Sequence, residues 1–510
     1  MRTLLYLTLA AAVSAASAQS PAPLKPIPPL KLSDLDRSTK ACVDFYQFAN
    51  GGWLASNPVP PAFSSWGSFT ELTERNYVVL REVLESSARA AKTTANPNTK
   101  KLGTYFASCM DSAGAEAAGA KPIGAGLARI AAISSRPQLN AAIAHIHSMG
   151  LAPLFSFGAD QDAKNSSLIV LAAGQGGLGL PNRDYYTKTD ANSEKIRTDY
   201  VAHLTKTFEL LGESPDLAKA HATKVLALET RLANASRTPV QLRDPIANYN
   251  PMPVIEINTM TPGFDWNAFM AGLGITGIST IDVGQPEYFK AMSVALQEVP
   301  LDDWKAYLSW RVADRMSPYL SSAFVNQNFA FRSILSGARQ MQPRWRRCLT
   351  SSDQVLGEAL GQEYVKVAFT PAAKSKALEM IENLRTVMRE RITKAAWMTE
   401  ATKKQALTKL AAFNRKIGYP DVWRDYSALR VEEAPYATNY LYSRAFAVKR
   451  DLAKLGKPVD RGEWFMTPPT VNAYFAPQLN EIAFPAGRLQ PPFFHPSYDD
   501  GANYGGIGGT

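Results

Sequence analysis

Amphipathic helical periodicity dominates the middle of the chain and restricts it to a mainly α-helical fold. The apolar positions of residues 376–397 are Leu378, Ile381, Leu384, Met388, Ile392 and Ala395. Steps of three and four residues place them on one stripe, with Glu and Arg outside, so we expect this face to be buried. Residues 215–236 follow the same pattern with Pro215 near the start, and residues 399–413 follow it with Thr399 as N-cap. The sequence therefore predicts three long helices here.

Strand signals are few and lie mainly near the C-terminus. Ser166–Ala173 is a short apolar run, and Val471–Phe475 and Asn480–Pro485 are rich in β-branched and aromatic residues around a turn with Pro477. Helical patterning gives way to strand, Pro and Gly signals around residues 456–464. We therefore expect a domain boundary there.

The first 40 residues carry an export signal and a spacer. Residues 1–18 have Arg2, an apolar stretch and then Ala16-Ser17-Ala18, the order of a secretory signal peptide with cleavage after Ala18. The apolar stretch is too short for a membrane span of about 20 residues, and no later segment reaches that length. Residues 19–40 contain five prolines and predict an extended tether, with the fold beginning near Ser33. We expect an exported protein, periplasmic or secreted, without a transmembrane segment.

Length and charge exclude some classes of protein. At roughly 150 residues per domain, 510 residues predict more than one compact unit. The net charge is +10, but no run of five or more basic residues occurs. A nucleic-acid or anionic-lipid surface would need such a cluster, so we expect a solvated basic surface and no nucleic-acid partner.

No complete catalytic constellation is readable from motifs alone. Gly174–Gly179 matches G-x-G-x-x-G, but no helical pattern follows it, which favours a connecting loop over a dinucleotide site. His145 and His147, two residues apart in an expected helix, point to different faces and cannot share a metal unaided. Asp499 and Asp500 are more typical of a solvated turn than of a catalytic acid pair. The motifs H-E-x-x-H, C-x-x-C and G-x-S-x-G are absent from the sequence.

Two features of the chain lack an explanation at this point. Residues 503–510, "NYGGIGGT", end the sequence on a glycine-rich segment that we expect to be a loop. There are three cysteines, Cys42, Cys109 and Cys348, so one of them has no partner within the chain.

Several long segments, in order, resemble the neprilysin and endothelin-converting-enzyme family of zinc endopeptidases. They are "CVDFYQFANGGWLASNPVP" (42–60), "GLGLPNRDYY" (177–186), "RWRRC" (344–348), "KIGYPDVWRDYSAL" (416–429), "VNAYFAPQLNEIAFPAGRLQPPFF" (471–494) and "ANYGGIGGT" (502–510). The resemblance covers nearly all of residues 40–510. It implies a mainly helical, two-lobed architecture with small β elements, which encloses a cavity that admits oligopeptides, and an incomplete thermolysin-like catalytic lobe.

In that family the "NYGGIG" segment leads within a few residues into H-E-x-x-H, whose histidines bind zinc and whose glutamate is the general base. The resemblance therefore predicts a chain truncated just before the zinc motif, with no catalytic or metal-binding residue of its own. A full-length parent would cleave oligopeptides, on the amino side of a hydrophobic residue, with zinc as cofactor. The chain as given would be inactive and would bind no zinc.

The resemblance also assigns roles to individual residues. It implies a disulfide between Cys109 and Cys348, and a partner for Cys42 beyond Thr510, so that truncation leaves Cys42 unpaired. Asn472 and Ala473 match the family's Asn-Ala pair, which bonds the backbone of an extended substrate. The alternative is that Val471–Phe475 is simply a core strand.

Three positions depart from the family pattern. Ser65 and Thr73 stand where mammalian neprilysin has arginines that help to read the substrate end, which favours general oligopeptide cleavage. Asn50 stands where the vertebrate enzymes have a cysteine.

The resulting hypothesis divides the chain into five parts: signal peptide (1–18), tether (19–40), N-terminal peptidase domain (41–425), connection (426–470) and the start of a zinc peptidase domain (471–510). A second hypothesis is a non-catalytic module that binds peptides or a partner. Under the first, we expect apolar faces left uncovered, including parts of residues 480–494.

Overall fold

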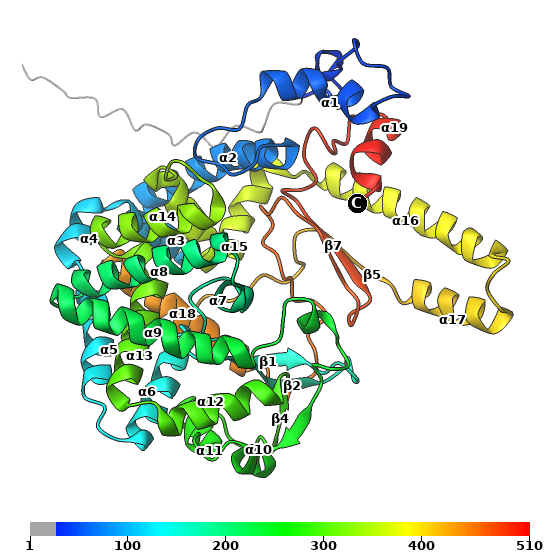
Figure 1. The fold of residues 1–510 in the computed structure, drawn as a ribbon. Coiled ribbons are helices and arrows are strands. Elements are labelled where there is room, and N and C mark those ends of the chain that lie inside the picture. The colour runs from blue at the N-terminus through cyan, green and yellow to red at the C-terminus, as the bar shows by residue number, and fades with distance from the viewer. Residues whose placement is uncertain (1–26) are drawn as a thin grey trace, which may run out of the picture.

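Two hydrophobic cores organise the protein in the computed structural model, which describes residues 27–510 (Figure 1). The first core is built from residues 123–331, here called the insert lobe. The second, the platform lobe, combines residues 79–109 with residues 348–507. The predicted signal peptide and the first part of the tether lie outside the described residues. Within 27–510, no helix is long and apolar enough to cross a membrane.

The insert lobe is a layered set of helices around one small sheet. Its helices are α5 (Lys121–Ala131), α6 (Arg136–Ser148), α7 (Asp184–Thr187), α8 (Ala191–Leu210), α9 (Pro215–Ala235), α10 (Val254–Met260), α11 (Trp266–Gly272), α12 (Pro286–Glu298), α13 (Leu301–Met316) and α14 (Ser322–Ser336). α9 confirms the helix predicted over residues 215–236, with Pro215 in its first turn. Helix α13 is buried along most of its length and carries Trp304 and Trp310 into the core.

The sheet of this lobe has the order β1-β2-β4-β3. Its strands are β1 (Ser156–Gln161), β2 (Ile169–Gly174), β3 (Pro251–Pro253) and β4 (Thr280–Val283). β1 and β2 form an antiparallel pair, and β2 runs parallel to β4. β2 corresponds to the strand predicted over Ser166–Ala173, and the glycine-rich segment after it is a loop that leads to α7 rather than a helix start.

The platform lobe brings together segments from both ends of the chain. Its helices are α1 (Phe45–Ser56), α2 (Ser68–Ala90), α3 (Pro97–Met110), α4 (Ser112–Ala118), α15 (Arg344–Ala368), α16 (Pro371–Lys394), α17 (Glu400–Ala411), α18 (Tyr436–Leu452) and α19 (Asp500–Asn503). α2, α3 and α15 pack against one another. Short 3₁₀ turns are η1 (Leu32–Asp34), η2 (Gln241–Arg243) and η3 (Ser317–Tyr319).

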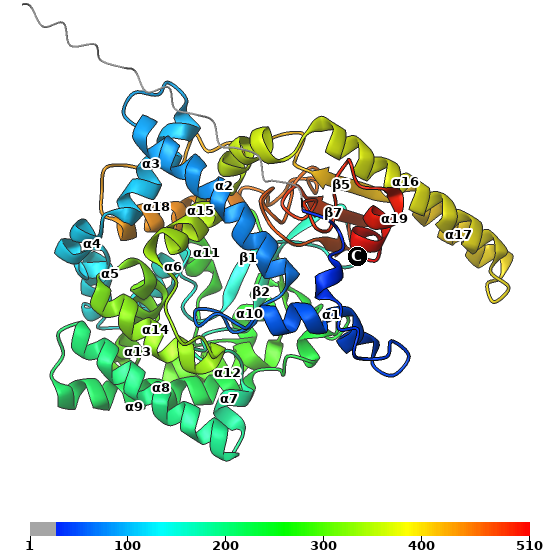
Figure 2. The same cartoon turned by 90° about the horizontal axis from the view of Figure 1, so that it is seen from above.

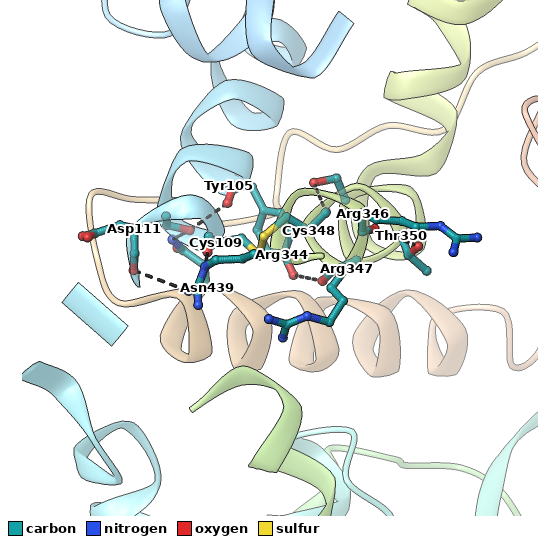
Figure 3. The surroundings of a disulfide bond; sticks show 12 residues. Tyr105, Cys109, Asp111, Arg344, Arg346, Arg347, Cys348, Thr350 and Asn439 are labelled. Atoms are coloured by element: carbon teal, nitrogen blue, oxygen red, sulfur yellow. Dashed lines mark hydrogen bonds between the residues drawn. A yellow bond between two sulfur atoms is a disulfide. The ribbon is translucent and has the colours of Figure 1, made fainter. Parts of the chain in front are cut away.

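A disulfide between Cys109 on α3 and Cys348 on α15 fastens this helix group (Figure 3). It is the pair that the family resemblance implies. Arg344 Nε donates to the carbonyl of Cys109 at 2.7 Å, and the hydroxyls of Tyr105 and Ser351 lie 2.8 Å apart, so α3 and α15 are joined around the sulfur atoms as well. Cys42 is exposed and not in a disulfide.

A three-stranded sheet with the order β5-β7-β6 forms the other side of the platform lobe. β5 (Asn414–Gly418) runs parallel to β7 (Glu481–Pro485), and β6 (Tyr474–Ala476) runs antiparallel to β7. β7 confirms the strand predicted over Asn480–Pro485. The strand predicted over Val471–Phe475 is displaced, because the paired residues begin only at Tyr474.

Helices α16 and α17 project from the platform lobe as an arm, visible in both views (Figures 1 and 2). Thr399 caps α17 by accepting a hydrogen bond from the Thr402 amide, as predicted. The prediction of one buried stripe along α16 is only half right. Its N-terminal half is buried, but Leu384 is 41% and Met388 51% exposed, because the distal half extends beyond the core.

The C-terminal segment is helical and not a loop. Asp499 and Asp500 are exposed, as expected, but Asp499 accepts a hydrogen bond from the Ala502 amide and so caps the short helix α19 instead of lying in a turn. A single π-helical turn, η4 (Tyr504–Gly508), continues the helix, and Ile507 is buried in the platform core. Gly506 passes so close to the Phe493 carbonyl that a Cβ would overlap it.

The expectation of uncovered apolar faces in residues 480–494 is also wrong. Ala483, Ala486, Leu489 and Phe494 are buried in this segment. Exposed apolar side chains are spread over both lobes, and one group of them lies on the distal arm, where Trp397 is 81% exposed.

Candidate functional site

The segment Asn472–Ala473 leads directly into β6, which is an edge strand of its sheet. Asn472 is exposed, and its Oδ1 accepts a hydrogen bond from the Ala473 amide at 2.9 Å. Ala473 is half-buried. Because β6 pairs on one side with β7, its other side can offer backbone groups to an added strand.

A buried ion pair supports this edge from the neighbouring strands. Glu481 opens β7 and is fully buried, and Lys416 on β5 donates to its Oε1 at 2.8 Å. Asn414 donates to the other carboxylate oxygen at 3.1 Å, and Lys416 also donates to the Glu463 carbonyl. Burial, together with the nearby Glu481 carboxylate, raises the pKa of Tyr474 in β6. The Tyr474 hydroxyl donates to Glu481 Oε1 at 3.4 Å, so the edge strand is tied to the sheet through this side chain as well as through the backbone.

The loop before the edge is fixed against α15. This helix bends at Leu356, and Gly357 and Gly361 follow on the face that meets the loop. A Cβ at Gly357 would overlap Thr467, and one at Gly361 would lie 2.6 Å from the Pro468 ring. Thr467 also donates to the buried carboxylate of Asp353 at 3.1 Å. The absence of side chains at these two glycines therefore sets how close the loop approaches α15.

A cavity of about 1830 Å³ opens beside this sheet and is lined by both lobes. Residues 159–161 of β1 contribute from the insert lobe, and Trp423, Tyr442, Phe465 and Ala476 contribute from the platform lobe. Ala476 ends β6, so the cavity begins where the edge strand stops. A space of this size exceeds that of most small-molecule sites, which span about 300–1,000 Å³, and has room for an oligopeptide.

Ion pairs lie in the cavity wall. Burial raises the pKa of Glu463, but contacts with Lys454 and Arg450 at 2.8 Å outweigh it and lower the pKa below its usual value. Arg424 pairs with Glu358 at 3.1 Å on the same wall. Both carboxylates are engaged in ion pairs, which fits a structural role in holding the wall.

The residues of 27–510 do not provide a zinc site. A catalytic zinc takes three protein ligands and a water, and no group of three His, Cys, Asp or Glu side chains able to hold a metal occurs in this range. His145 and His147 lie on α6 as expected; His147 is buried against Phe155 and Phe269, and burial lowers its pKa to about 3. Asp499 caps α19, and Asp500 pairs with Lys376 at 2.8 Å.

The structure also places Ser65 and Thr73, and it shows the surroundings of Arg488. Ser65 precedes α2 and Thr73 lies on it, and Thr73 donates to the Phe69 carbonyl as an ordinary helix-surface residue. Arg488, which motif reading passed over, is buried beside Phe69 and Phe493. The sequence did contain a signal for its burial, because Arg488 is a cation within the mostly apolar run "FPAGRLQPPFF".

Comparison with known proteins gives a consistent picture. Two family models described as Peptidase family M13 match residues 41–420 and 472–510. The endothelin-converting enzymes 1 of Rattus norvegicus and Homo sapiens are 31% and 32% identical over 502 residues, covering 94% of this chain and 64% of each relative. The chain therefore spans less than two thirds of the length of these curated relatives.

Solved structures show the same fold. The zinc metalloprotease Zmp1 of Mycobacterium tuberculosis, in complex with an inhibitor, superposes with a TM-score of 0.89 at 34% identity and covers 95% of this chain and 73% of that one. PepO from Lactobacillus rhamnosis has a TM-score of 0.81 at 22% identity, covering 92% of this chain and 74% of its own, a likeness of fold alone.

Proposed function

Because the chain belongs to peptidase family M13, we propose that it binds extended oligopeptides along β6. A zinc metalloendopeptidase of this family would cleave the peptides that it binds in this way. The observation that carries this proposal is the exposed Asn472–Ala473 segment at the start of an edge strand, next to a cavity of oligopeptide size. An edge strand adds a peptide through main-chain hydrogen bonds, which are independent of the peptide's sequence. The Asn472 amide and the Ala473 carbonyl are the groups we assign to this task.

Hydrolysis is a separate part of the proposal. In a family enzyme, zinc would polarise the scissile carbonyl and acidify a bound water. The described residues offer no ligand set for it, so we assign no step through zinc to this chain. We propose that residues 1–510 bind peptide but do not cleave it.

Export is also part of the proposed function. The support is the order of charged, apolar and small residues in 1–18, together with a disulfide, which persists in oxidising compartments. N-terminal sequencing of the protein recovered from the periplasm or medium should begin at Gln19. Recovery of an uncleaved chain in the cytosol would contradict export.

Peptide binding can be tested by fluorescence anisotropy with a labelled apolar heptapeptide. Asn472→Ala removes the exposed amide and should weaken binding about fivefold to tenfold, the effect of one lost hydrogen bond. Asn192→Ala on α8 is the matched control, since Asn192 is exposed on the other lobe. Equal affinity of the wild-type chain and the Asn472 variant would reject the edge as the binding site.

A hydrolysis assay on the same peptide, with added zinc, tests the second part. We expect no cleavage above buffer, as seen by mass spectrometry of the reaction. Cleavage that a chelator abolishes and zinc restores would overturn the proposal that this chain is inactive.

A second candidate function is a non-catalytic peptide-binding or interaction module. It is favoured by one observation: the C-terminal segment packs into the platform core, with Ile507 and Phe494 buried, without requiring zinc ligands. Reading the coding DNA beyond codon 510 separates the two. An in-frame or frame-shifted H-E-x-x-H within a few codons supports the peptidase, and its absence from every frame supports the module.

A further inference from the structure

A pocket of about 540 Å³ lies where the two lobes meet, and it is here called the interlobe pocket. Helix α18, orange in Figure 1, forms one wall and belongs to both cores, since Tyr436 packs in the platform core and Ala437 in the core of the insert lobe. Arg315 at the end of α13 and Tyr319 in η3 contribute from the insert lobe. The volume falls within the range of about 300–1,000 Å³ that is usual for small-molecule sites. A ligand bound here would contact both lobes.

One face of α18 lines the interlobe pocket. Its lining residues follow one another at steps of three or four, which places them on the same side of the helix; they are Tyr440, Arg444, Ala447 and Arg450. Ser443, which also lines the pocket, and Ala447 have short side chains, so they leave space between the longer ones. The helix therefore offers two guanidinium groups to one hollow.

Positive charge dominates the lining. Among the residues that the structure describes, no aspartate or glutamate lines the interlobe pocket, whereas four arginines do: Arg315, Arg424, Arg444 and Arg450. Arg424 pairs with Glu358 at 3.1 Å, outside the lining. Arg450 pairs in the same way with Glu463 at 2.8 Å. Arg315 and Arg444 have no ion-pair partner within residues 27–510, so the pocket holds two uncompensated positive charges.

Arg315 has the fewer contacts of these two arginines. Its neighbour Asp314 is buried and pairs with Arg332 at 2.7 Å, so this carboxylate is already engaged. Arg315 itself is exposed at the pocket, and no hydrogen bond joins its side chain to another described residue. Partial burial, and then the charge of Arg311, lower the pKa of Arg315, but an arginine stays protonated at neutral pH. Its guanidinium therefore has donors available for a ligand.

Arg444 is held by a loop of the insert lobe. Its Nε and Nη2 both donate to the Gly150 carbonyl, at 3.4 Å and 3.2 Å, so a single neutral oxygen serves two donors. A Cβ at Gly150 would lie 2.9 Å from the Cβ of Arg444, so this close approach requires a glycine. Ala152 also lines the pocket, and its φ of 38° lies in the left-handed region that residues with a side chain rarely adopt. Strained backbone of this kind is concentrated at active sites and ligand clamps.

We propose that the interlobe pocket binds a phosphate group, which accepts hydrogen bonds from Arg315 of α13 and Arg444 of α18. A phosphate group has three acceptor oxygens and close to two negative charges at neutral pH, and the guanidinium fork matches such oxygens in pairs. Because these oxygens are arranged tetrahedrally, one phosphate can accept from two guanidinium groups that come from different directions, whereas the two oxygens of a carboxylate lie in one plane. The charge of the ligand also matches the two arginines without an ion-pair partner. This site is independent of the proposed peptide binding.

Isothermal titration calorimetry of the whole chain, in a zwitterionic buffer at constant ionic strength, tests the proposal. The probes are inorganic phosphate, phenyl phosphate and acetate. Inorganic phosphate should bind at least about tenfold more tightly than acetate, because it engages a second arginine through charge-assisted hydrogen bonds. Tighter binding of phenyl phosphate than of inorganic phosphate would mean that the pocket takes an aromatic phosphate ester, with its ring toward Tyr319 and Tyr440. Equal or weaker binding would mean that it takes the free anion, and both results support a phosphate site.

Four variants assign the effect to the two arginines. Arg315→Met and Arg444→Met should each weaken phosphate binding by at least about tenfold, since each removes one charged fork. Arg444→Lys should keep the charge but bind more weakly than the wild type, because an ammonium group lacks the fork. Arg243→Met, at an exposed arginine of η2 outside the pocket, removes the same charge and should leave the affinity unchanged. Because Arg315 has no hydrogen bond to lose, Arg315→Met should melt at the wild-type temperature without phosphate.

Thermal melts with phosphate give a second readout. Phosphate should raise the melting temperature of the wild type and of Arg243→Met, but not that of Arg315→Met, since a ligand that binds the folded state stabilises it. Equal affinity for phosphate and acetate, phosphate binding that persists in both Met variants of the pocket, or no binding by the wild type at millimolar phosphate would each overturn the proposal. Asn472→Ala should leave phosphate binding unchanged, so failure of this proposal and failure of peptide binding are distinguishable.

Discussion

Replacing Asp353 by Asn should stabilise the protein at neutral and higher pH and change little at acidic pH. Asp353 lies on α15, and one of its carboxylate oxygens accepts from Thr467 while the other, Oδ1, is buried without a partner. Burial raises the pKa of this carboxyl from 3.8 to about 6, and the hydrogen bond from Thr467 offsets only part of the effect. The ionised form is therefore the unfavourable one in the folded state.

The sign and size of the effect follow from linkage between proton binding and folding. Because the folded pKa lies above the unfolded one, stability is greatest below about pH 3.8 and is lost as the pH rises toward 6. A difference of roughly 2 pKa units corresponds to about 3 kcal/mol. Asn is neutral at every pH and keeps an oxygen for Thr467, so Asp353→Asn should gain up to about 3 kcal/mol at about pH 8 and close to nothing at about pH 4.

Urea unfolding followed by tryptophan fluorescence, at both pH values, measures the difference between variant and wild type. Asp421→Asn is the control, because the Asp421 side chain is 95% exposed and should give a small difference at both pH values. A stability gain for Asp353→Asn that is equal at the two pH values, or a loss at the higher one, would refute the reasoning. Either result would mean that the carboxylate has a favourable partner in the folded protein.

Three further predictions concern the supports of the candidate site. Glu481→Gln should lower the free energy of unfolding by about 3–5 kcal/mol, because Lys416 keeps a buried charge without its partner. Adding Lys416→Met should recover most of the loss. Urea titration of the wild type, the single variant and the double variant measures both effects. Cys109→Ser should cost at most about 5 kcal/mol, the chain-entropy value for a loop closed across 239 residues, and dithiothreitol should destabilise the wild type but not the variant in thermal melts. Met388→Gln on the exposed half of α16 should reduce binding of an apolar dye and slow aggregation measured by light scattering, and unchanged values would mean that this face is covered in solution.

Apolar periodicity and capping residues predicted the helices well where other parts of the protein do not change the local preference. Residues 215–236 and 399–413 have complete helical stripes with recognisable starts, and they form α9 and α17 close to the predicted bounds. Along α16 the same pattern misled, because periodicity shows which face is apolar but not whether another element covers it. For the C-terminal segment, glycine content favoured a loop, although Asp499 was available as an N-cap signal.

The candidate site was less accessible to sequence reasoning. Asn472 and Ala473 came from family resemblance, since the local pattern allowed a core strand equally well. The edge position of β6 depends on sheet order, which pairs β6 and β5 with opposite sides of β7. Arg488 was visible as a charge in a mostly apolar run, but its packing against Phe69, which is far from it in sequence, was not.

α15, an element distant in sequence, helps to set the position of the proposed peptide-binding edge. α15 is held at its start by the disulfide from Cys348 to α3. Further along, Gly357 and Gly361 receive the loop of Thr467 and Pro468, which leads within a few residues to Asn472. Each contact in this series is close-packed, so a shift of α15 must move the edge as well. The affinity for an extended peptide should therefore respond to substitutions on α15 that never touch the peptide, and a bulky residue at Gly361 is the sharpest of these.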